Sequence, residues 1–235
     1  MSKTILLIGS SGGLGNVISN WFAEKGFNLA MHFHKHEPIV PAGNHKKYKA
    51  DITDENQVQQ LIKQVIADFG KIDVVINNAG ISKSEMSWKT SAESWNQSLA
   101  VNLTGPFFIA KHVLPHMRTN NGGRIIFMSS VVAQTGFIGT SAYTASKAGL
   151  IGLTKTLAKE NATKNITINT LAPGYFSTGM ISDVTEDLQE ELKKFIPVGK
   201  LGNPTEIAAL IDYIISDNAS YLTGQVIGLN GGLHM

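Results

Sequence analysis

The chain has 235 residues, of which 43% are hydrophobic and 16% charged, and its formal charge is +2. It contains no Cys, which excludes disulfides, iron–sulfur clusters, cysteine-ligated zinc and a thiol nucleophile. So small a charge gives no basis for nucleic-acid binding, and the longest apolar run, 207–211, falls far short of the roughly 20 residues of a membrane span. We therefore expect a cytoplasmic protein with no nucleic-acid or membrane partner. The charged fraction is below the roughly 25% of an average soluble chain, which favours an oligomer.

Short β-branched apolar runs alternate with longer segments of helical period. They predict strands at residues 4–8, 28–33, 46–50, 72–76, 124–128, 167–171 and 225–229. Helices are expected at 13–25, 55–69, 92–117, 142–163 and 205–216, with Pro106 interrupting the third. The alternation predicts an α/β, doubly wound Rossmann fold. Its seven-stranded parallel sheet would carry helices on both faces, with a ligand crevice at the carboxyl ends of the strands.

No linker or repeat divides the chain, so we expect a single dinucleotide-binding and catalytic domain over residues 1–235. The long irregular stretch 172–201, with a helical patch at 186–195, is typical of a substrate lid. Its apolar residues suit an acyl chain or another lipophilic carbonyl compound, although they could equally pack the segment onto the domain. They are Tyr175, Phe176, Met180, Ile181, Leu188, Leu192 and Phe195.

A glycine-rich turn joins the first predicted strand directly to a helix. Glycines let the backbone turn sharply and approach a pyrophosphate, whose charge is then stabilised by the amide groups and dipole of the helix N-terminus. The setting predicts a dinucleotide site rather than a tight turn without a ligand. Its candidate cofactor-binding residues are Gly9, Ser11, Gly13, Leu14 and Gly15.

The segment after the second strand bears on the choice of nucleotide. An Asp or Glu that binds a free ribose 2′-hydroxyl normally lies about 20 residues beyond the glycines. No acid occurs from Gly26 to His36, and the chain offers His32, His34 and Lys35 instead. Because Lys35 and the imidazoles could meet a 2′-phosphate, we favour NADPH, with NADH as the alternative if these are only solvated loop residues. No carboxylate accompanies the histidines, so no metal site is predicted.

Two further strand ends contribute candidate cofactor-binding residues. Asp51 and Ile52 follow the third strand and are expected to flank the adenine edge, a role compatible with Asp51 or Thr53 capping the next helix. The fourth strand ends in Asn-Asn-Ala-Gly at 77–80, where small residues would let a flat nucleotide lie close to the backbone. The candidates there are Asn78, Ala79 and Gly80.

Three polar residues form a candidate catalytic group. Tyr143 and Lys147 lie four residues apart on a predicted helix and so share a face. A Tyr titrates near pH 10, and lowering its pKa to neutrality would require about 4 to 5.5 kcal/mol, which Lys147 and a cationic nicotinamide could supply. Ser130, at the end of the fifth strand, could hydrogen-bond the same substrate oxygen.

Taken together, these motifs resemble the short-chain dehydrogenase/reductase family over essentially the whole chain. The marks are the glycine turn, the segment 77–80, Asn102, Ser130, Tyr143, Lys147, and Pro173-Gly174 with Thr178. The resemblance implies an NAD(P)-dependent oxidoreductase in which Tyr143 is the general acid/base and Ser130 positions the carbonyl or alcohol. It further implies that Lys147 binds the nicotinamide ribose and that Asn102 holds a water that relays protons to it. Pro173, Gly174 and Thr178 would line the nicotinamide end.

Within that family the chain is most similar to the β-ketoacyl-[acyl-carrier-protein] reductases, on the stretches 129–132, 143–152, 171–175 and 221–232. This implies NADPH-dependent reduction of a β-ketoacyl thioester in fatty acid biosynthesis by a homotetramer, with acyl carrier protein as a candidate partner. The basic docking positions of such reductases correspond here to Asn121 and Lys164, with Arg118, Arg124 and Lys159 nearby. The alternatives are an NAD(P)-dependent dehydrogenase of a small alcohol, sugar or secondary metabolite, and a non-catalytic cofactor-binding protein, which the intact Ser, Tyr and Lys disfavour.

Overall fold

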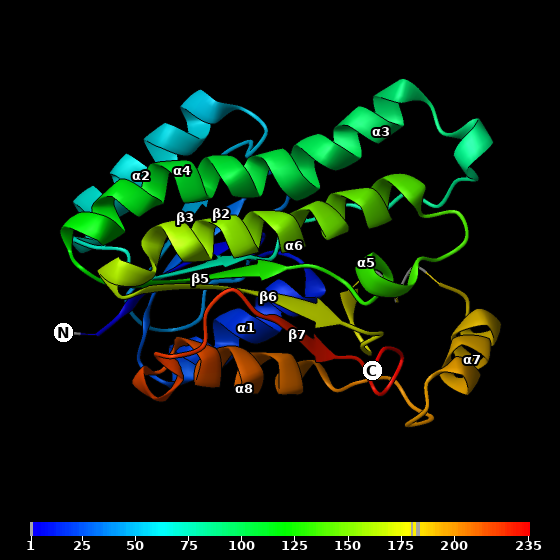
Figure 1. Ribbon diagram of the computed structural model, residues 1–235. Helices are drawn as coiled ribbons and strands as arrows, with labels where there is room; N and C mark the ends of the chain where they lie inside the picture. The colour runs from blue at the N-terminus through cyan, green and yellow to red at the C-terminus, as the bar shows by residue number, and fades with distance from the viewer. Residues whose placement is uncertain (1, 180, 182–183) are drawn as a thin grey trace.

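A single parallel sheet runs through the computed structural model, which describes residues 2–179, 181 and 184–235 (Figure 1). Its order is β3-β2-β1-β4-β5-β6-β7, so the order reverses between β1 and β4, as the doubly wound fold predicts. The strands are β1 Thr4–Ile8, β2 Asn28–Phe33, β3 His45–Lys49, β4 Val74–Asn77, β5 Gly123–Met128, β6 Ile166–Pro173 and β7 Val226–Leu229.

Helices cover both faces of this sheet: α2, α4 and α6 lie on one side, and α1 and α8 on the other (Figure 1). The α-helices are α1 Gly13–Glu24, α2 Glu55–Phe69, α3 Ala92–Leu99, α4 Gly105–Thr119, α5 Val132–Thr135, α6 Ser141–Asn161, α7 Glu186–Phe195 and α8 Pro204–Ile215. Short 3₁₀ helices occupy Ser87–Lys89, Ala162–Lys164 and Asp217–Ala219. Because both faces are buried, the central strands β1 and β4 are almost entirely apolar, and alternate residues of the sheet enter two separate cores. None of the described helices is both long and apolar enough to cross a membrane.

The predicted helix 92–117 is three elements in the structure. α3 ends at Leu99, a π-helical turn, η2, spans Ala100–Thr104, and α4 begins at Gly105 with Pro106 in its first turn. Pro has no N–H, so Pro106 cannot donate the α-helical hydrogen bond to the carbonyl four residues earlier, that of Asn102. The proline therefore disturbs the turn before it, and the helical path continues rather than breaking.

The connection from β2 to β3 contains no helix, unlike the other crossovers to a parallel neighbour. Residues 34–44 cross as a loop, and β3 lies at the sheet edge with exposed Lys46, Lys47 and Lys49. Only Tyr48 of this strand is buried, and its hydroxyl donates to Asp68 at 2.7 Å. Charged side chains on an edge strand oppose pairing with a second sheet.

The segment expected to form a lid begins after Pro173, because β6 extends two residues beyond its predicted end. Phe176 pairs with Gly202 in an isolated β-bridge, and Phe176, Ile181 and Leu192 are buried. Leu188 and Phe195 are exposed, whereas Met180 lies outside the described residues. Three of the apolar residues considered for the substrate therefore pack inward.

Candidate active site

The glycine turn, residues 9–15, packs tightly against the residues that follow β4. Gly9 has φ +78°, and a Cβ there would lie 2.7 Å from the Cα of Ala79. The side chain of Asn78 donates from Nδ2 to the carbonyl of Gly9 at 2.9 Å. Asn78 and Ala79 thus fix the conformation of the glycine turn. The small side chain of Ala79 is needed for this packing against Gly9.

The N-terminus of α1 is suited to an anion. Its N-cap, Gly12, provides no side-chain cap, and the first turn holds no acid, so the positive end of the helix is not neutralised. A Cβ at Gly12 would meet nothing within 4 Å. Gly15 packs tightly against the Gly9 carbonyl inside the turn, and Ser11 and Leu14 lie between these glycines. This open, amide-lined turn fits a dinucleotide pyrophosphate.

Thr178 covers the turn from the far side. A Cβ at Gly13 would collide with the Thr178 hydroxyl and lie 2.5 Å from the amide nitrogen of Gly179. Thr178, which the family resemblance implies at the nicotinamide end, thus lies against the glycine turn.

His32 has a structural role that sequence reasoning missed. It is 2% exposed; its Nδ1 accepts from the Gly9 amide at 3.2 Å, and its Nε2 lies 3.0 Å from the carbonyl of Ala50. This bridge joins the ends of β1 and β3 and requires a neutral ring protonated on Nε2. Ser10 adds a hydroxyl bond of 2.8 Å to the His32 carbonyl. The expectation that the His32 imidazole helps to bind a 2′-phosphate is therefore wrong.

The buried ring should make stability depend on pH. Burial lowers the pKa of His32 from 6.5 to about 4, although the Ala50 hydrogen bond acts in the opposite direction. Between these values the unfolded chain binds a proton that the folded chain does not, so stability is complete above pH 6.5 and lost as the pH falls towards 4. The separation corresponds to about 3 kcal/mol. In urea titrations at pH 7 and pH 4, His32→Gln should show a smaller pH-dependent loss than the unaltered chain; equal losses would contradict the assignment.

The adenosine side of the site carries the remaining predicted nucleotide residues. His34 and Lys35 are exposed just after β2, with His34 Nε2 3.9 Å from Asp51 Oδ2. Asp51 accepts from the Thr53 amide at 2.9 Å, and the Thr53 bonds help to lower its pKa against the opposing effect of burial. Ile52 is buried against Gly105, so only its backbone could face an adenine.

The cap of α2 differs from the expectation. Asp54, rather than Asp51 or Thr53, is the N-cap, and its side chain accepts from the amides of Asn56 and Gln57. Within the described part of the chain, no group of three His, Asp or Glu side chains is placed to hold a metal ion.

Lys147 lies at the centre of the candidate catalytic group. It is 3% exposed, its Nζ donates to the Met128 carbonyl at 2.6 Å, and the same nitrogen lies 5.7 Å from the centre of the Tyr143 ring. Burial lowers the pKa of Lys147 to about 8. A Cβ at Gly80 would lie 3.1 Å from Nζ, so the predicted small residue leaves this lysine room.

The side chains of Tyr143 and Ser130 interact. Burial raises the pKa of the Tyr143 phenol, a hydrogen bond with the Ser130 side chain partly offsets this, and the nearby Tyr175 adds to the increase. The net change in the Tyr143 pKa is therefore upward, opposite to the lowering expected from Lys147. The phenol is therefore protonated at neutral pH, which is the state a proton donor needs.

Asn102 buttresses this group through its side chain. Its amide bonds both the N–H and the carbonyl of Ile81 at 2.9 Å and donates to Ser146 Oγ at 3.0 Å. Because these bonds occupy the side chain, a relay water would have to bind at the backbone carbonyl of Asn102. That carbonyl has no α-helical donor, since the residue four positions later is Pro106, which has no N–H. Single π-turns inside helices are frequent at functional sites, and this one holds Asn102.

The ends of β5, β6 and β7 close the site. The Val131 amide donates to the Pro173 carbonyl at 2.8 Å, and the Gly174 amide donates to the Leu229 carbonyl at 2.9 Å. A Cβ at Gly174 would lie 2.8 Å from the Cα of Asn230. Pro173 is thus held beside Val131, the residue after Ser130, and Gly174 is held beside the end of β7.

Comparisons with known proteins agree with this geometry. A family model described as Enoyl-(Acyl carrier protein) reductase matches residues 8–234. The chain is 36% identical to the 3-oxoacyl-[acyl-carrier-protein] reductase FabG of Staphylococcus epidermidis, over the full length of both proteins. It is 37% identical to FabG of Thermotoga maritima, covering 98% of this chain and 97% of the relative. It is 39% identical to the acetoacetyl-CoA reductase of Shinella zoogloeoides, covering 99% and 98%. The chain belongs to the short-chain dehydrogenase/reductase family of NAD(P)-dependent oxidoreductases.

Proposed function

We propose that the protein reduces a 3-oxoacyl thioester to the 3-hydroxyacyl thioester with NADPH. The observation that carries this proposal is the convergence of a protonated phenol, the Ser130 hydroxyl and a buried Lys147 beside an uncapped, glycine-rich helix N-terminus. The full-length similarity to relatives named for 3-oxoacyl and acetoacetyl reduction supports the substrate class.

Each catalytic group has one task in this reaction. When bound, the reduced nicotinamide supplies a hydride to the carbonyl carbon. Tyr143 donates its phenolic proton to the carbonyl oxygen, and Ser130 donates a hydrogen bond to the same oxygen as negative charge develops on it. Lys147 places its charge beside the Tyr143 ring and stabilises the phenolate that remains, and Asn102 fixes the loop and helix around Lys147 through Ile81 and Ser146.

The preference for NADPH is part of the proposal. The first acid after β2 is Glu37, and its carboxylate pairs with Lys47 on the edge strand, which neutralises a group that would repel a 2′-phosphate. Lys35 is exposed at the end of β2, where the ribose of a dinucleotide lies in this fold.

Replacing Lys35 tests this preference. A hydrogen bond to a charged group contributes about 1.5 to 3 kcal/mol, so Lys35→Ser should weaken NADPH binding by about ten- to a hundredfold and leave NADH binding nearly unchanged. Lys46→Ser is the matched control, because Lys46 lies on the neighbouring strand β3 and is already paired with Asp68 at 2.8 Å. Titration of both nucleotides by fluorescence measures the effect, and an equal loss for NADH would contradict it.

Carrier-protein docking and assembly are further parts of the proposal. Arg124 is buried, so the exposed candidates for docking are Asn121, Lys159, Lys164 and Arg118, which also donates to Asn161 at 3.0 Å. Asn121 and Lys164 precede the amino ends of β5 and β6, whereas Ser130 follows the carboxyl end of β5, so a carrier protein docked there would not lie over the site of the same protomer.

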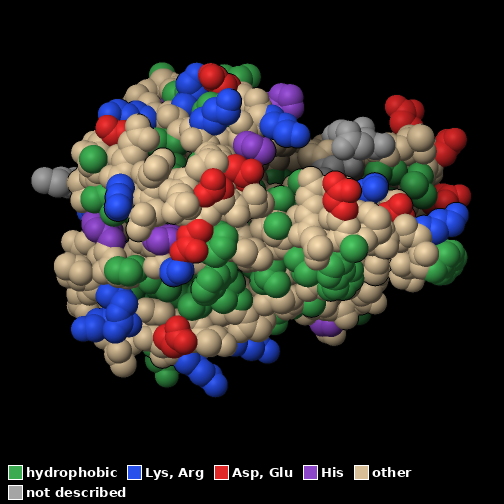
Figure 2. Space-filling view, turned by 90° about the horizontal axis from the view of Figure 1, so that it is seen from above, with side chains coloured by type: hydrophobic (Ala, Val, Ile, Leu, Met, Phe, Trp, Pro, Cys, Tyr) green, Lys and Arg blue, Asp and Glu red, His purple; other side chains and the backbone are tan. Residues whose placement is uncertain are grey.

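We further propose a cytoplasmic homotetramer and a lid over residues 174–201. Figure 2 views the α4 and α6 layer from above and shows hydrophobic side chains gathered in patches across it, and exposed Trp95 and Phe107 belong to α3 and α4. Such patches favour association with other copies of the chain. Sedimentation velocity at several concentrations measures the assembly, and a monomer throughout would contradict it.

A substrate panel tests the proposed function. Purified protein with NADPH is given acetoacetyl thioesters of pantetheine, coenzyme A and acyl carrier protein, a crotonyl thioester, and a set of simple ketones and sugars. We expect NADPH loss with the acetoacetyl thioesters and little with the crotonyl thioester, which has no ketone for Tyr143 and Ser130 to bind. Turnover of crotonyl alone would favour enoyl reduction, and turnover of simple ketones or sugars alone would favour a small-molecule dehydrogenase.

A further inference from the structure

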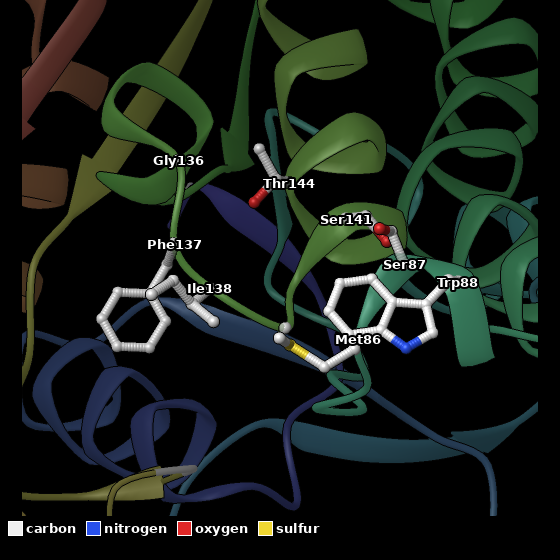
Figure 3. A pocket seen from close by; sticks show the side chains of 9 residues that line it. Met86, Ser87, Trp88, Gly136, Phe137, Ile138, Ser141 and Thr144 are labelled. Carbon is white, nitrogen blue, oxygen red and sulfur yellow. The ribbon is translucent and has the colours of Figure 1, made fainter.

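The turn of α6 that carries the candidate catalytic pair begins beside an open hollow. A cavity of about 390 Å³ borders the start of the helix, and Figure 3 shows Ser141 and Thr144 there, beside the loop 136–138. Thr140, the N-cap of α6, makes no side-chain hydrogen bond to the free amides of the first turn. The start of the helix is therefore held less firmly than a capped and packed helix end. The position of the catalytic turn must come from other contacts.

A buried serine hydroxyl connects this turn to the end of β5. Ser129 is buried, and its Oγ donates to the backbone carbonyl of Lys147 at 2.8 Å. The ammonium of the same lysine donates to the carbonyl of Met128 at 2.6 Å. Two consecutive residues at one strand end thus hold the lysine both by its backbone and by the tip of its side chain.

The sheet in turn fixes the serine. The Ser129 amide donates to the Leu171 carbonyl at 2.8 Å, which extends the pairing of β5 with β6 by one residue. A carbonyl inside a helix already accepts from the amide four residues on, and its second lone pair is free to accept from a hydroxyl. The Ser129 bond therefore joins the helix to the sheet without disturbing the helix.

A second buried serine contacts the same turn from another side. The Oγ of Ser146 accepts from Asn102 Nδ2 at 3.0 Å and donates to the Tyr143 carbonyl at 2.7 Å. Serine hydroxyls thus bond the backbone carbonyls of both members of the catalytic pair. Ser146 acts within its own helix and through Asn102, whereas Ser129 connects the turn directly to the strand end that leads into Ser130.

We propose that Ser129 is a positioning residue for the reaction, an inference that rests on the proposed function. Through the Lys147 carbonyl it sets the distance between the helical turn that carries the phenol and the ammonium and the strand end that carries Ser130. Active-site groups must be held to within about 0.5 Å of the productive geometry, and a misplacement of about 1 Å can lower a rate by about 10²-fold. The Ser129 hydroxyl is bonded to the helix, so its contribution is to this geometry.

Ser129→Ala removes the bond with the loss of one oxygen atom. With an acetoacetyl thioester and NADPH, kcat should fall about 10- to 100-fold while KM for the thioester changes little. NADPH affinity, measured by fluorescence, should fall about three- to tenfold, less than the loss of a whole charged hydrogen bond, because the Lys147 ammonium is displaced but still present. The binding measurement needs no turnover, so it tests the role of Ser129 even if the proposed substrate is wrong.

Thr154→Val is the matched control. Thr154 lies two turns further along α6, and its buried hydroxyl bonds that of Thr170 on β6 at 2.5 Å. The control also removes a hydroxyl bond between α6 and the sheet and leaves the Thr170 hydroxyl unpaired. In urea it should therefore destabilise the protein at least as much as Ser129→Ala does. Its kcat and NADPH affinity should nevertheless match those of the unaltered protein.

Three results would overturn the proposal. The first is an unaltered kcat in Ser129→Ala or, if the thioester is not a substrate, an unaltered NADPH affinity. The second is an equal loss in Thr154→Val, which would trace both effects to weaker packing of α6. The third is a Ser129→Ala chain that does not fold although Thr154→Val does, which would make the serine a residue of the fold alone.

Discussion

Tyr143→Phe is expected to lower kcat by about 10² to 10⁴ while leaving nucleotide affinity nearly unchanged. The substitution removes one oxygen atom and retains the ring on which Lys147 packs. Because burial raises the pKa of this phenol, the group is protonated at neutral pH, which is the state that the proposed proton donor needs. Steady-state rates with an acetoacetyl thioester, together with NADPH binding by fluorescence, measure the two effects separately.

The neighbouring Tyr175 provides the control. It lies close enough to raise the pKa of Tyr143, so Tyr175→Phe removes a second phenol from the same region. We expect a far smaller loss from Tyr175→Phe than from Tyr143→Phe. Near-normal turnover of the Tyr143 variant, or the larger loss in the Tyr175 variant, would remove Tyr143 from the proposed role.

Gly9→Ala is expected to destabilise the fold by about 2 to 5 kcal/mol and to abolish measurable nucleotide binding. Two costs combine: a positive φ that disfavours an L side chain, and a Cβ forced to 2.7 Å from the Ala79 backbone, where neither partner can move freely. Urea unfolding and nucleotide titration measure these losses.

Gly26→Ala separates the two costs. Gly26 has nearly the same φ, +77°, but a Cβ there would meet nothing within 4 Å. It should therefore lose only the conformational part, about 1 kcal/mol, and retain nucleotide binding. Equal destabilisation of the two variants would show that the contact between Gly9 and Ala79 contributes nothing.

The alternation of strands and helices made the fold predictable, because the spacing of apolar residues in each segment indicates both its type and which of its faces is buried. The predicted bounds of helices and strands were wrong by a few residues. The prediction also missed a change in helix type that a residue in the following turn causes. Pro106 was recognised as a disturbance, but its consequence lies in the turn at Ala100–Thr104, since a missing N–H acts on the carbonyl four residues earlier.

The candidate site was predictable where a local pattern carries it, as in the glycine turn and the Tyr143–Lys147 pair. His32 was not, because its bridge from Gly9 to Ala50 depends on three strands that are adjacent only in space. A buried imidazole and a phosphate-binding imidazole look alike in sequence.

Transfer of isotope from [4,4-²H₂]NADPH, which carries deuterium at both C4 positions, to an acetoacetyl thioester tests the central claim most directly, when the product is analysed by mass spectrometry and NMR. We predict a 3-hydroxybutyryl thioester with deuterium on C3 from the unaltered protein, formed far more slowly by Tyr143→Phe. Deuterium elsewhere in the product, a saturated butyryl product from a crotonyl thioester in its place, or no isotope transfer to any 3-oxoacyl thioester would contradict it.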